Sequence, residues 1–175
     1  MMLTDGQFSD PDLAAIMGAP AQVAAMGRIE AALARAQGRL GMIPPDAADR
    51  IAAVAGGFAP DPATLIAAAA SAGIPAQAYV AALKKACGKD GAFAHYGATS
   101  QDIQDSALIL QLRNALAVIE DRLTALDREL AARGDAFGAQ PIPARTRISP
   151  CSRPISPLHG RAAADAMPFP RSWRR

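Results

Sequence analysis

The sequence predicts an all-α fold, and three observations carry this prediction. Of the 175 residues, 43 are alanine, the strongest helix former, and only eight are aromatic, which disfavours sheets. Apolar residues recur every three or four positions over long stretches, which is the helical period. Proline and glycine punctuate these stretches at the places where helices start and stop. With 51% hydrophobic and 19% charged residues, the chain has the balance of a protein that buries a core.

Residues 1–100 are expected to form a small N-terminal domain of short helices. Most of these helices should open at an Asp or Pro and close at a Gly, because these residues cap helix ends. The expected helices are a first segment from Asp10 to Met17, one from Val23 to Leu40, one from Pro45 or Asp46 to about Val54, one opening at Asp61 and Pro62 and stopping at Gly73, and one from Pro75 to near Gly88. The glycine-rich stretch from 90 to 100 is expected to be a loop.

Residues 101–147 are expected to begin a helical bundle, with one long helix from about Gln101 to Arg133. Its apolar residues fall in a near-heptad stripe: Leu108, Leu112, Leu116, Ile119, Leu123, Leu126 and Leu130. Such a helix would be roughly 45 to 50 Å long, more than a small domain needs, so partner helices or partner chains are expected. Gly134 and Gly138 should end it, and Pro141 and Pro143 should prevent its restart.

Several classes of protein are disfavoured. No apolar run reaches the roughly 18 residues that a membrane helix needs, and the N-terminus lacks the pattern of a signal peptide, so a cytoplasmic protein without membrane partners is expected. Cys87 and Cys151 show neither CxxC spacing nor nearby histidines, so neither a metal site nor a disulfide framework is expected.

The charge is unevenly distributed, and this bears on possible partners. Residues 1–147 hold 13 Lys and Arg against 15 Asp and Glu, whereas residues 148–175 hold five Arg and one acid, Asp165. The folded body is therefore slightly acidic, which argues against nucleic acid as a partner. Residues 148–175 also change abruptly to a Pro- and Arg-rich composition. They are expected to be an aberrant tail, either disordered or translated out of frame from a GC-rich gene.

The loop before the long helix concentrates the polar chemistry of the chain. His95, two aliphatic hydroxyls, two side-chain amides and two carboxylates lie within the eleven residues from His95 to Asp105. Thr99 or Ser100 can cap the helix, and the free N–H groups of its first turn favour a bound carboxylate. His95 could donate to an anion or move a proton. The alternative is purely structural, in which Ser100 caps the helix and His95 is an ordinary loop residue.

The segment HYGATSQD, from His95 to Asp102, resembles the first signature region of the fumarase/aspartase superfamily, a His-x-Gly-x-Thr-Ser-x-Asp pattern. The stretch from Val23 to Pro44 is similar to the N-terminal helix of the same superfamily, where a Glu-Ala-Ala-Leu-Ala core around Glu30 runs into Gly-x-Ile-Pro. The resemblance covers roughly residues 8–147. Within the superfamily, GATSQDIQDSALILQLRNAL is most similar to bacterial 3-carboxy-cis,cis-muconate cycloisomerases, with adenylosuccinate lyases next.

The resemblance implies lactonisation of a small tricarboxylic acid, carboxymuconate, in the protocatechuate branch of the β-ketoadipate pathway, without metal or cofactor. By resemblance, Thr99 and Ser100 would bind a substrate carboxylate, His95 would lie in the substrate pocket as a catalytic candidate, and Asp102 would order the loop. Arg145 and Thr146 would begin the second signature region and also bind substrate. Members of the superfamily assemble as homotetramers whose active sites draw on three subunits.

The resemblance stops after Arg147. The expected Gln-x-Ala-x-Pro continuation does not follow, and the Gly-Ser-Ser-x-Met-Pro-x-Lys loop that carries the proposed general base is not in the sequence. The chain is therefore expected to be an incomplete, inactive copy that associates through its leucine stripe. Two alternatives remain, an adenylosuccinate lyase-like fragment and a non-catalytic helical interaction module. His159, in the tail, is not expected to be catalytic.

Overall fold

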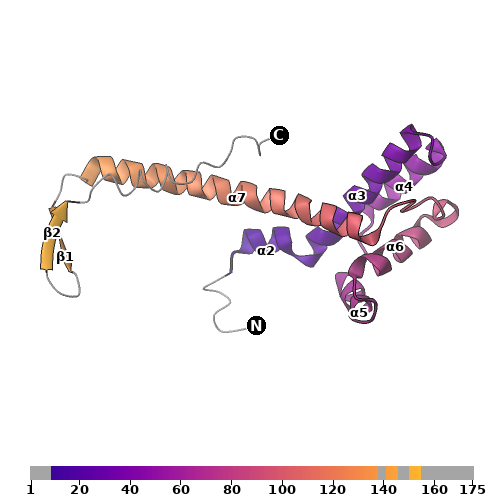
Figure 1. The fold of residues 1–175 in the computed structure, drawn as a ribbon, viewed down its shortest axis with the longest axis horizontal. Helices are drawn as coiled ribbons and strands as arrows, with labels where there is room; N and C mark the ends of the chain where they lie inside the picture. Colours follow the sequence, from indigo (N-terminus) through magenta and orange to yellow (C-terminus); the bar gives the residue numbers. More distant parts are fainter. Residues whose placement is uncertain (1–8, 138–140, 146–149, 155–175) are drawn as a thin grey trace. The chain divides into compact units, whose positions relative to one another are not determined.

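The computed structural model describes residues 9–137, 141–145 and 150–154, and it divides the chain into two units, Met1–Leu116 and Ala117–Arg175. The all-α prediction is confirmed for residues 9–137. The α-helices, labelled in Figure 1, are α2 (Pro11–Met17), α3 (Ala19–Arg39), α4 (Pro45–Gly57), α5 (Pro62–Ala72), α6 (Pro75–Ala86) and α7 (Ser100–Phe137), and the 3₁₀ turn η1 (Gly88–Asp90) follows α6.

The starts of the short helices follow the predicted capping chemistry. The Asp10 carboxylate accepts a hydrogen bond from the backbone N–H of Leu13, and the Asp61 carboxylate accepts one from Ala63. Proline occupies the first or second position of α2 to α6, where its missing N–H costs nothing. Gly73, with φ +82°, ends α5 in the left-handed conformation that glycine adopts readily.

The core of the first unit lies around α3, which packs against α4 (Figure 1). Gly27 allows this close approach, since a Cβ at this position would lie 2.4 Å from the carbonyl oxygen of Ala55 on α4. Tyr79 of α6 is fully buried beside the same contact, and its ring packs edge-on against Phe58. The most deeply buried large side chains are Tyr79, Met26, Ile51, Leu83, Ile103 and Glu30.

The buried face of α3 differs from the apolar stripe that the helical period predicts for this segment, namely Val23, Met26, Ile29, Leu33, Ala36 and Leu40. Val23 and Met26 are buried as expected, but Leu40 is 75% exposed and lies just beyond the helix end. The buried face instead includes two polar residues, Glu30 and Gln37. Their polar side chains make contacts with the loop after η1, and these contacts explain why α3 turns this face inward.

Helix α7 was predicted from Gln101 to Arg133 and is found from Ser100 to Phe137. The prediction that Gly134 ends it is wrong, because a single glycine costs a helix only about 1 kcal/mol and the helix continues through it. The buried residues of α7 are Ile103, Ala107, Gln111 and Ala115. The predicted leucine stripe lies on a different face and is exposed at every position: Leu108, Leu112, Leu116, Ile119, Leu123, Leu126 and Leu130.

Beyond α7, the second unit contains two short strands that the sequence did not predict. Strands β1 (Pro141–Arg145) and β2 (Pro150–Pro154) pair antiparallel, with Pro143 opposite Ser152. Most of the expected aberrant tail, including His159, lies outside the described residues. Among the described helices, none is by itself long and apolar enough to cross a membrane, although α4 and α5 together would pass that test across a bend of 101°.

Candidate functional site

The loop from Gly91 to Thr99 ends in a reciprocal cap on the first turn of α7. The backbone N–H and the hydroxyl of Thr99 donate to Asp102 Oδ2 at 2.9 and 2.8 Å, and the backbone N–H of Asp102 donates back to Thr99 Oγ1 at 3.2 Å. This is a capping box with Asp in place of the usual Glu or Gln. These hydrogen bonds from Thr99 lower the pKa of the Asp102 carboxyl, which therefore stays ionised at neutral pH.

The cap decides between the two candidates for the N-cap position in favour of Thr99. Ser100 is the first residue of α7, and its side chain is only partly exposed. Within the described part of the chain, the Ser100 hydroxyl has no hydrogen-bond partner, whereas the Thr99 hydroxyl is engaged by Asp102. Because the Asp102 N–H already donates to Thr99, the donors left for an anion in this turn are the Ser100 hydroxyl and the backbone N–H groups of Ser100 and Gln101.

His95 is held by a buried carboxylate of α3. Its Nδ1 lies 2.6 Å from Glu30 Oε1, with side-chain exposures of 10% and 1% respectively. Burial raises the pKa of the Glu30 carboxyl, although the hydrogen bond with His95 and the charges of His95 and Lys84 act against this. The backbone of His95 is left-handed, with φ +56°, the only non-glycine residue in this conformation among those described.

A second contact fixes the same loop to α3. The side-chain amide of Gln37 donates to the backbone carbonyl of Tyr96 at 2.6 Å. Gly97 then turns the chain with φ +66°, a conformation that favours glycine. Glu30 and Gln37 lie seven residues apart, two helical turns, so both face the loop from one side of α3.

The curated proteins that are similar to this chain include three enzymes of different activity. N-acetyl-S-(2-succino)cysteine lyase from Dickeya dadantii is 32% identical over 152 residues, 81% of this chain and 34% of that protein. 3-Carboxy-cis,cis-muconate cycloisomerase from Pseudomonas aeruginosa is 37% identical over 148 residues, 82% of this chain and 32% of that protein. Adenylosuccinate lyase from Methanothermobacter thermautotrophicus is 33% identical over 130 residues, 74% and 29% of the two chains. No family model matches the sequence.

The fold agrees with these similarities. The crystal structure of 3-carboxy-cis,cis-muconate lactonizing enzyme from Pseudomonas putida superposes with a TM-score of 0.78 at 35% identity, over 85% of this chain and 35% of that one. The chain has homologues among lyase/fumarase superfamily enzymes, and the matches extend over most of its own length. It spans about a third of the length of the curated relatives that it matches.

Two further residues expected to bind substrate, Arg145 and Thr146, do not belong to the first unit. Arg145 is the last residue of β1, in the second unit, and only its backbone is described. Thr146 lies outside the described residues. The candidate site that the structure describes in this chain consists of His95, Thr99, Ser100 and Asp102, and the α3 residues Glu30 and Gln37 contact the same loop.

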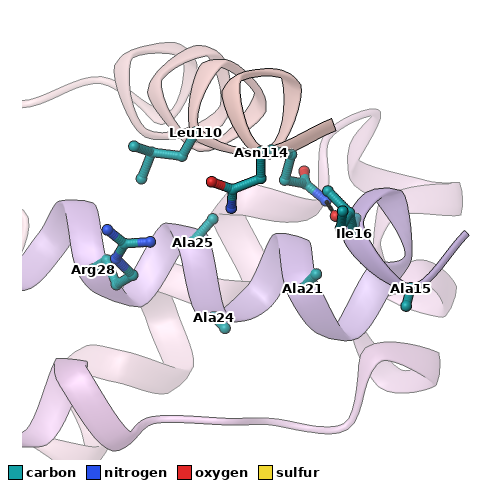
Figure 2. Close-up of a pocket in the computed structure, with 9 residues that line it drawn as sticks. Ala15, Ile16, Ala21, Ala24, Ala25, Arg28, Leu110 and Asn114 are labelled. Atoms are coloured by element: carbon teal, nitrogen blue, oxygen red, sulfur yellow. Dashed lines mark hydrogen bonds between the residues drawn. The ribbon is translucent and has the colours of Figure 1, made fainter. Parts of the chain in front are cut away.

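The first unit of this chain also has a groove between α2, α3 and α7 (Figure 2). Four of its nine lining residues are alanines, and its polar members are Arg28 of α3 with Gln111 and Asn114 of α7. The Gln111 amide donates to the carbonyl of Ile16 at 2.9 Å. None of the candidate site residues lines it. No group of three or more His, Cys, Asp or Glu residues in the described ranges is arranged to hold a metal ion.

The residues that sequence reasoning missed as part of the site are Glu30 and Gln37. Each interrupts an otherwise alanine-rich helical face, and a polar residue that falls on the buried face of a helix needs a buried partner. This signal was readable in the sequence. The identity of the partners, 59 and 65 residues further along the chain, was not.

Proposed function

We propose that this chain carries the carboxylate-binding segment of a 3-carboxy-cis,cis-muconate cycloisomerase-like enzyme that acts in the cytoplasm on a small tricarboxylic acid, without metal or cofactor. The observation that carries the proposal is the capping box at α7, which makes Ser100 the first residue of a helix whose N-terminal N–H groups favour an anion. His95 lies four residues before Thr99 in the same short loop. Asp102 orders this loop by holding Thr99.

The proposed reaction needs donors at a carboxylate. In the lactonisation, one carboxylate oxygen of the substrate adds to a carbon of a C=C bond, and the neighbouring carbon takes up a proton. The electron pair of the broken π bond is held for a time on the second carboxylate, as an aci-carboxylate, before that proton arrives. Aligned N–H and O–H donors stabilise this charge, and Ser100 with the first turn of α7 supplies them. The group that gives this proton, and that acts as general base in the reverse elimination, is not assigned to any residue of this chain, and we expect these 175 residues alone to show no turnover.

A second candidate is a lyase acting on a succinyl-type substrate. It is supported by the similarity to N-acetyl-S-(2-succino)cysteine lyase and adenylosuccinate lyase at 32% and 33% identity. Both candidates use the same donors for a carboxylate, so the loop by itself does not discriminate between them. A third reading, a non-catalytic helical module, would keep the exposed stripe of α7 and need no anion at the loop.

Direct binding separates these candidates. Isothermal titration of the chain with 3-carboxy-cis,cis-muconate, N-acetyl-S-(2-succino)cysteine and adenylosuccinate should show tightest binding of the carboxymuconate. Ser100→Ala should weaken that binding about tenfold, the effect of losing one hydrogen bond to a charged group. Ser106→Ala, one and a half turns further along α7, is the matched control and should bind as the wild type does. Tightest binding of a succinyl compound would favour the second candidate, and no anion binding would favour the third.

We also propose that the chain forms homo-oligomers through α7, with a tetramer as the expected state of a complete enzyme. The support is the apolar stripe, whose seven residues are all exposed. Light scattering after gel filtration should give a mass above that of the monomer. Replacing Leu123 and Leu126 with lysine should lower it to the monomer, while Leu40→Lys, at an exposed leucine outside the stripe, should not. A monomeric wild-type chain would contradict this part of the proposal.

A further inference from the structure

The Glu30 and His95 pair is the one buried pair of titratable side chains in contact within the described residues that the proposed reaction does not explain. Glu30 is 1% exposed in the middle of α3, and burying a carboxylate costs several kcal/mol unless it is paired. Its Oε1 contacts His95, while its Oε2 is buried with no hydrogen-bond partner among the described residues. The carboxylate therefore directs its one hydrogen bond to the imidazole.

The contact is made by a specific ring atom. The nearer nitrogen of His95 is Nδ1, at 2.6 Å from Glu30 Oε1, a distance typical of a charge-assisted hydrogen bond. An ionised carboxylate can only accept, so Nδ1 must carry the proton whenever Glu30 is charged. The other charged or ionisable groups that act on the pair are Lys84 and Tyr79 of α6, Cys87 after α6, and Asp102 of α7. Lys84 favours the ionised carboxylate.

We propose that Glu30 is a positioning residue that fixes the proton of His95 on Nδ1 and so keeps Nε2 as the nitrogen that meets the substrate. The role of Nε2 rests on the function proposed above, whereas the position of the proton does not. A neutral His95 in this state offers Nε2 as a hydrogen-bond acceptor and base, and a protonated one offers it as a donor and acid. Without Glu30 the ring would be free to place its proton on Nε2, and this nitrogen would then offer the substrate a hydrogen-bond donor instead of an acceptor.

A structural role alone would make a different prediction. Gln37 holds the same loop from the same side of α3, through the backbone carbonyl of Tyr96. If the pair served only to dock the loop, loss of either contact would disturb His95 in the same way. If Glu30 fixes the ring proton of His95 on Nδ1, only loss of the Glu30 carboxylate should change the tautomer of His95.

The experiment is nitrogen NMR of the imidazole rings in the full chain. The chain has two histidines, so labelling with ¹⁵N-histidine gives two ring systems, and His159→Gln assigns them. At alkaline pH, where imidazole is neutral, wild-type His95 should show a protonated Nδ1 and an unprotonated Nε2. In Glu30→Met, which keeps the side-chain length and removes the acceptor, the Nε2–H tautomer should become the major one. In Gln37→Leu the tautomer should be that of the wild type.

Glu30→Gln is the second variant in case the methionine variant does not fold. Its amide oxygen is a weaker acceptor, so the Nδ1–H population should fall below that of the wild type. A wild-type His95 protonated on Nε2, or a tautomer unchanged by both Glu30 variants, would overturn the proposal. An equal change in Gln37→Leu would assign the effect to loop docking and overturn it as well. Adding carboxymuconate tests whether Nε2 of His95 meets the substrate. A wild-type Nε2 signal that does not respond would contradict the proposed function, while the assignment of the proton to Nδ1 would still hold.

Discussion

The side-chain amide of Gln37 donates to the backbone carbonyl of Tyr96 at 2.6 Å, joining two residues 59 positions apart. Gln37 is 6% exposed and lies in the last turns of α3, while Tyr96 lies in the candidate loop. One hydrogen bond therefore links the longest helix of the core before α7 to the segment that we propose to bind carboxylate. The loop is positioned by the core as well as by the cap on α7.

Removing this hydrogen bond should destabilise the fold modestly. Gln37→Leu is expected to lower the free energy of unfolding by about 1 kcal/mol, the net value of a typical hydrogen bond. The measurement is urea unfolding followed by far-ultraviolet circular dichroism. Gln77→Leu, at an exposed glutamine of α6, is the control and should change the value by less than about 0.5 kcal/mol. Equal values for both variants would mean that the contact contributes nothing to stability.

The Arg50 and Asp90 ion pair should make stability depend on acid pH. Two hydrogen bonds, 2.7 and 3.0 Å long, join the guanidinium of α4 to the carboxylate in η1, and they lower the pKa of Asp90 below its ordinary value of 3.8. The stabilisation is complete above that ordinary value and is lost as the pH falls through the lowered pKa. Asp90→Asn should therefore have a lower melting temperature than the wild type at pH 7, and the difference should shrink in strong acid.

Thermal unfolding at pH 7 and in steps down to pH 2 checks this expectation. Asp49→Asn is a suitable control, because Asp49 is an exposed carboxylate next to Arg50 on the same helix. Its difference from the wild type should be small at every pH. If the difference in melting temperature between the wild type and Asp90→Asn widened in acid, the predicted direction of the pH dependence would be wrong.

Gly27 should not tolerate a side chain. A Cβ there would meet the Ala55 carbonyl oxygen at 2.4 Å and the Tyr79 hydroxyl at 3.1 Å, so α3 and α4 would have to separate. Gly27→Ala is expected to cost about 2 kcal/mol of unfolding free energy. Gly56→Ala, in α4 with nothing within 4 Å of the added atom, should stabilise by about 0.5 kcal/mol. Chemical denaturation compares the two, and a stabilised Gly27→Ala would show that the helices are not in close contact.

The capping role of Thr99 gives a prediction about the start of α7. Thr99→Val removes the hydroxyl that joins Asp102 and is expected to lower stability by about 1 kcal/mol. Thr99→Ser keeps the hydroxyl, so its stability should remain close to that of the wild type. Amide hydrogen exchange at Asp102 and Ile103 would locate the effect, because fraying of the first turn speeds exchange there. Unchanged amide exchange in Thr99→Val would show that the Thr99 cap does not stabilise the first turn of α7.

Much of the fold was predictable because it depends on local signals. Asp10, Asp61 and the prolines after them start helices through their own chemistry, and the structure begins helices at those places. The far end of α7 was not predictable from Gly134, because the weak penalty of one glycine does not decide where a helix stops. The pairing of β1 with β2 was also missed, since proline-rich segments carry little strand signal.

The candidate site also combines contacts that the local sequence predicts with contacts that depend on packing. Thr99 and Asp102 are three residues apart, so their contact follows from helix geometry that the sequence displays. The contact between Glu30 and His95 depends on how α3 is rotated in the core, which is a property of the packed structure. Apolar periodicity suggested a stripe that included Leu40, and only packing revealed that Glu30 and Gln37 lie inside.

The left-handed backbone of His95 affects how this residue can be studied by mutagenesis. At φ +56° an alanine would carry a conformational cost of order 1 kcal/mol that has nothing to do with the imidazole. Asparagine adopts this conformation more easily than most residues. A comparison of His95→Asn with His95→Ala would thus separate the contribution of the ring from that of the main chain, and an alanine scan alone would report the two together.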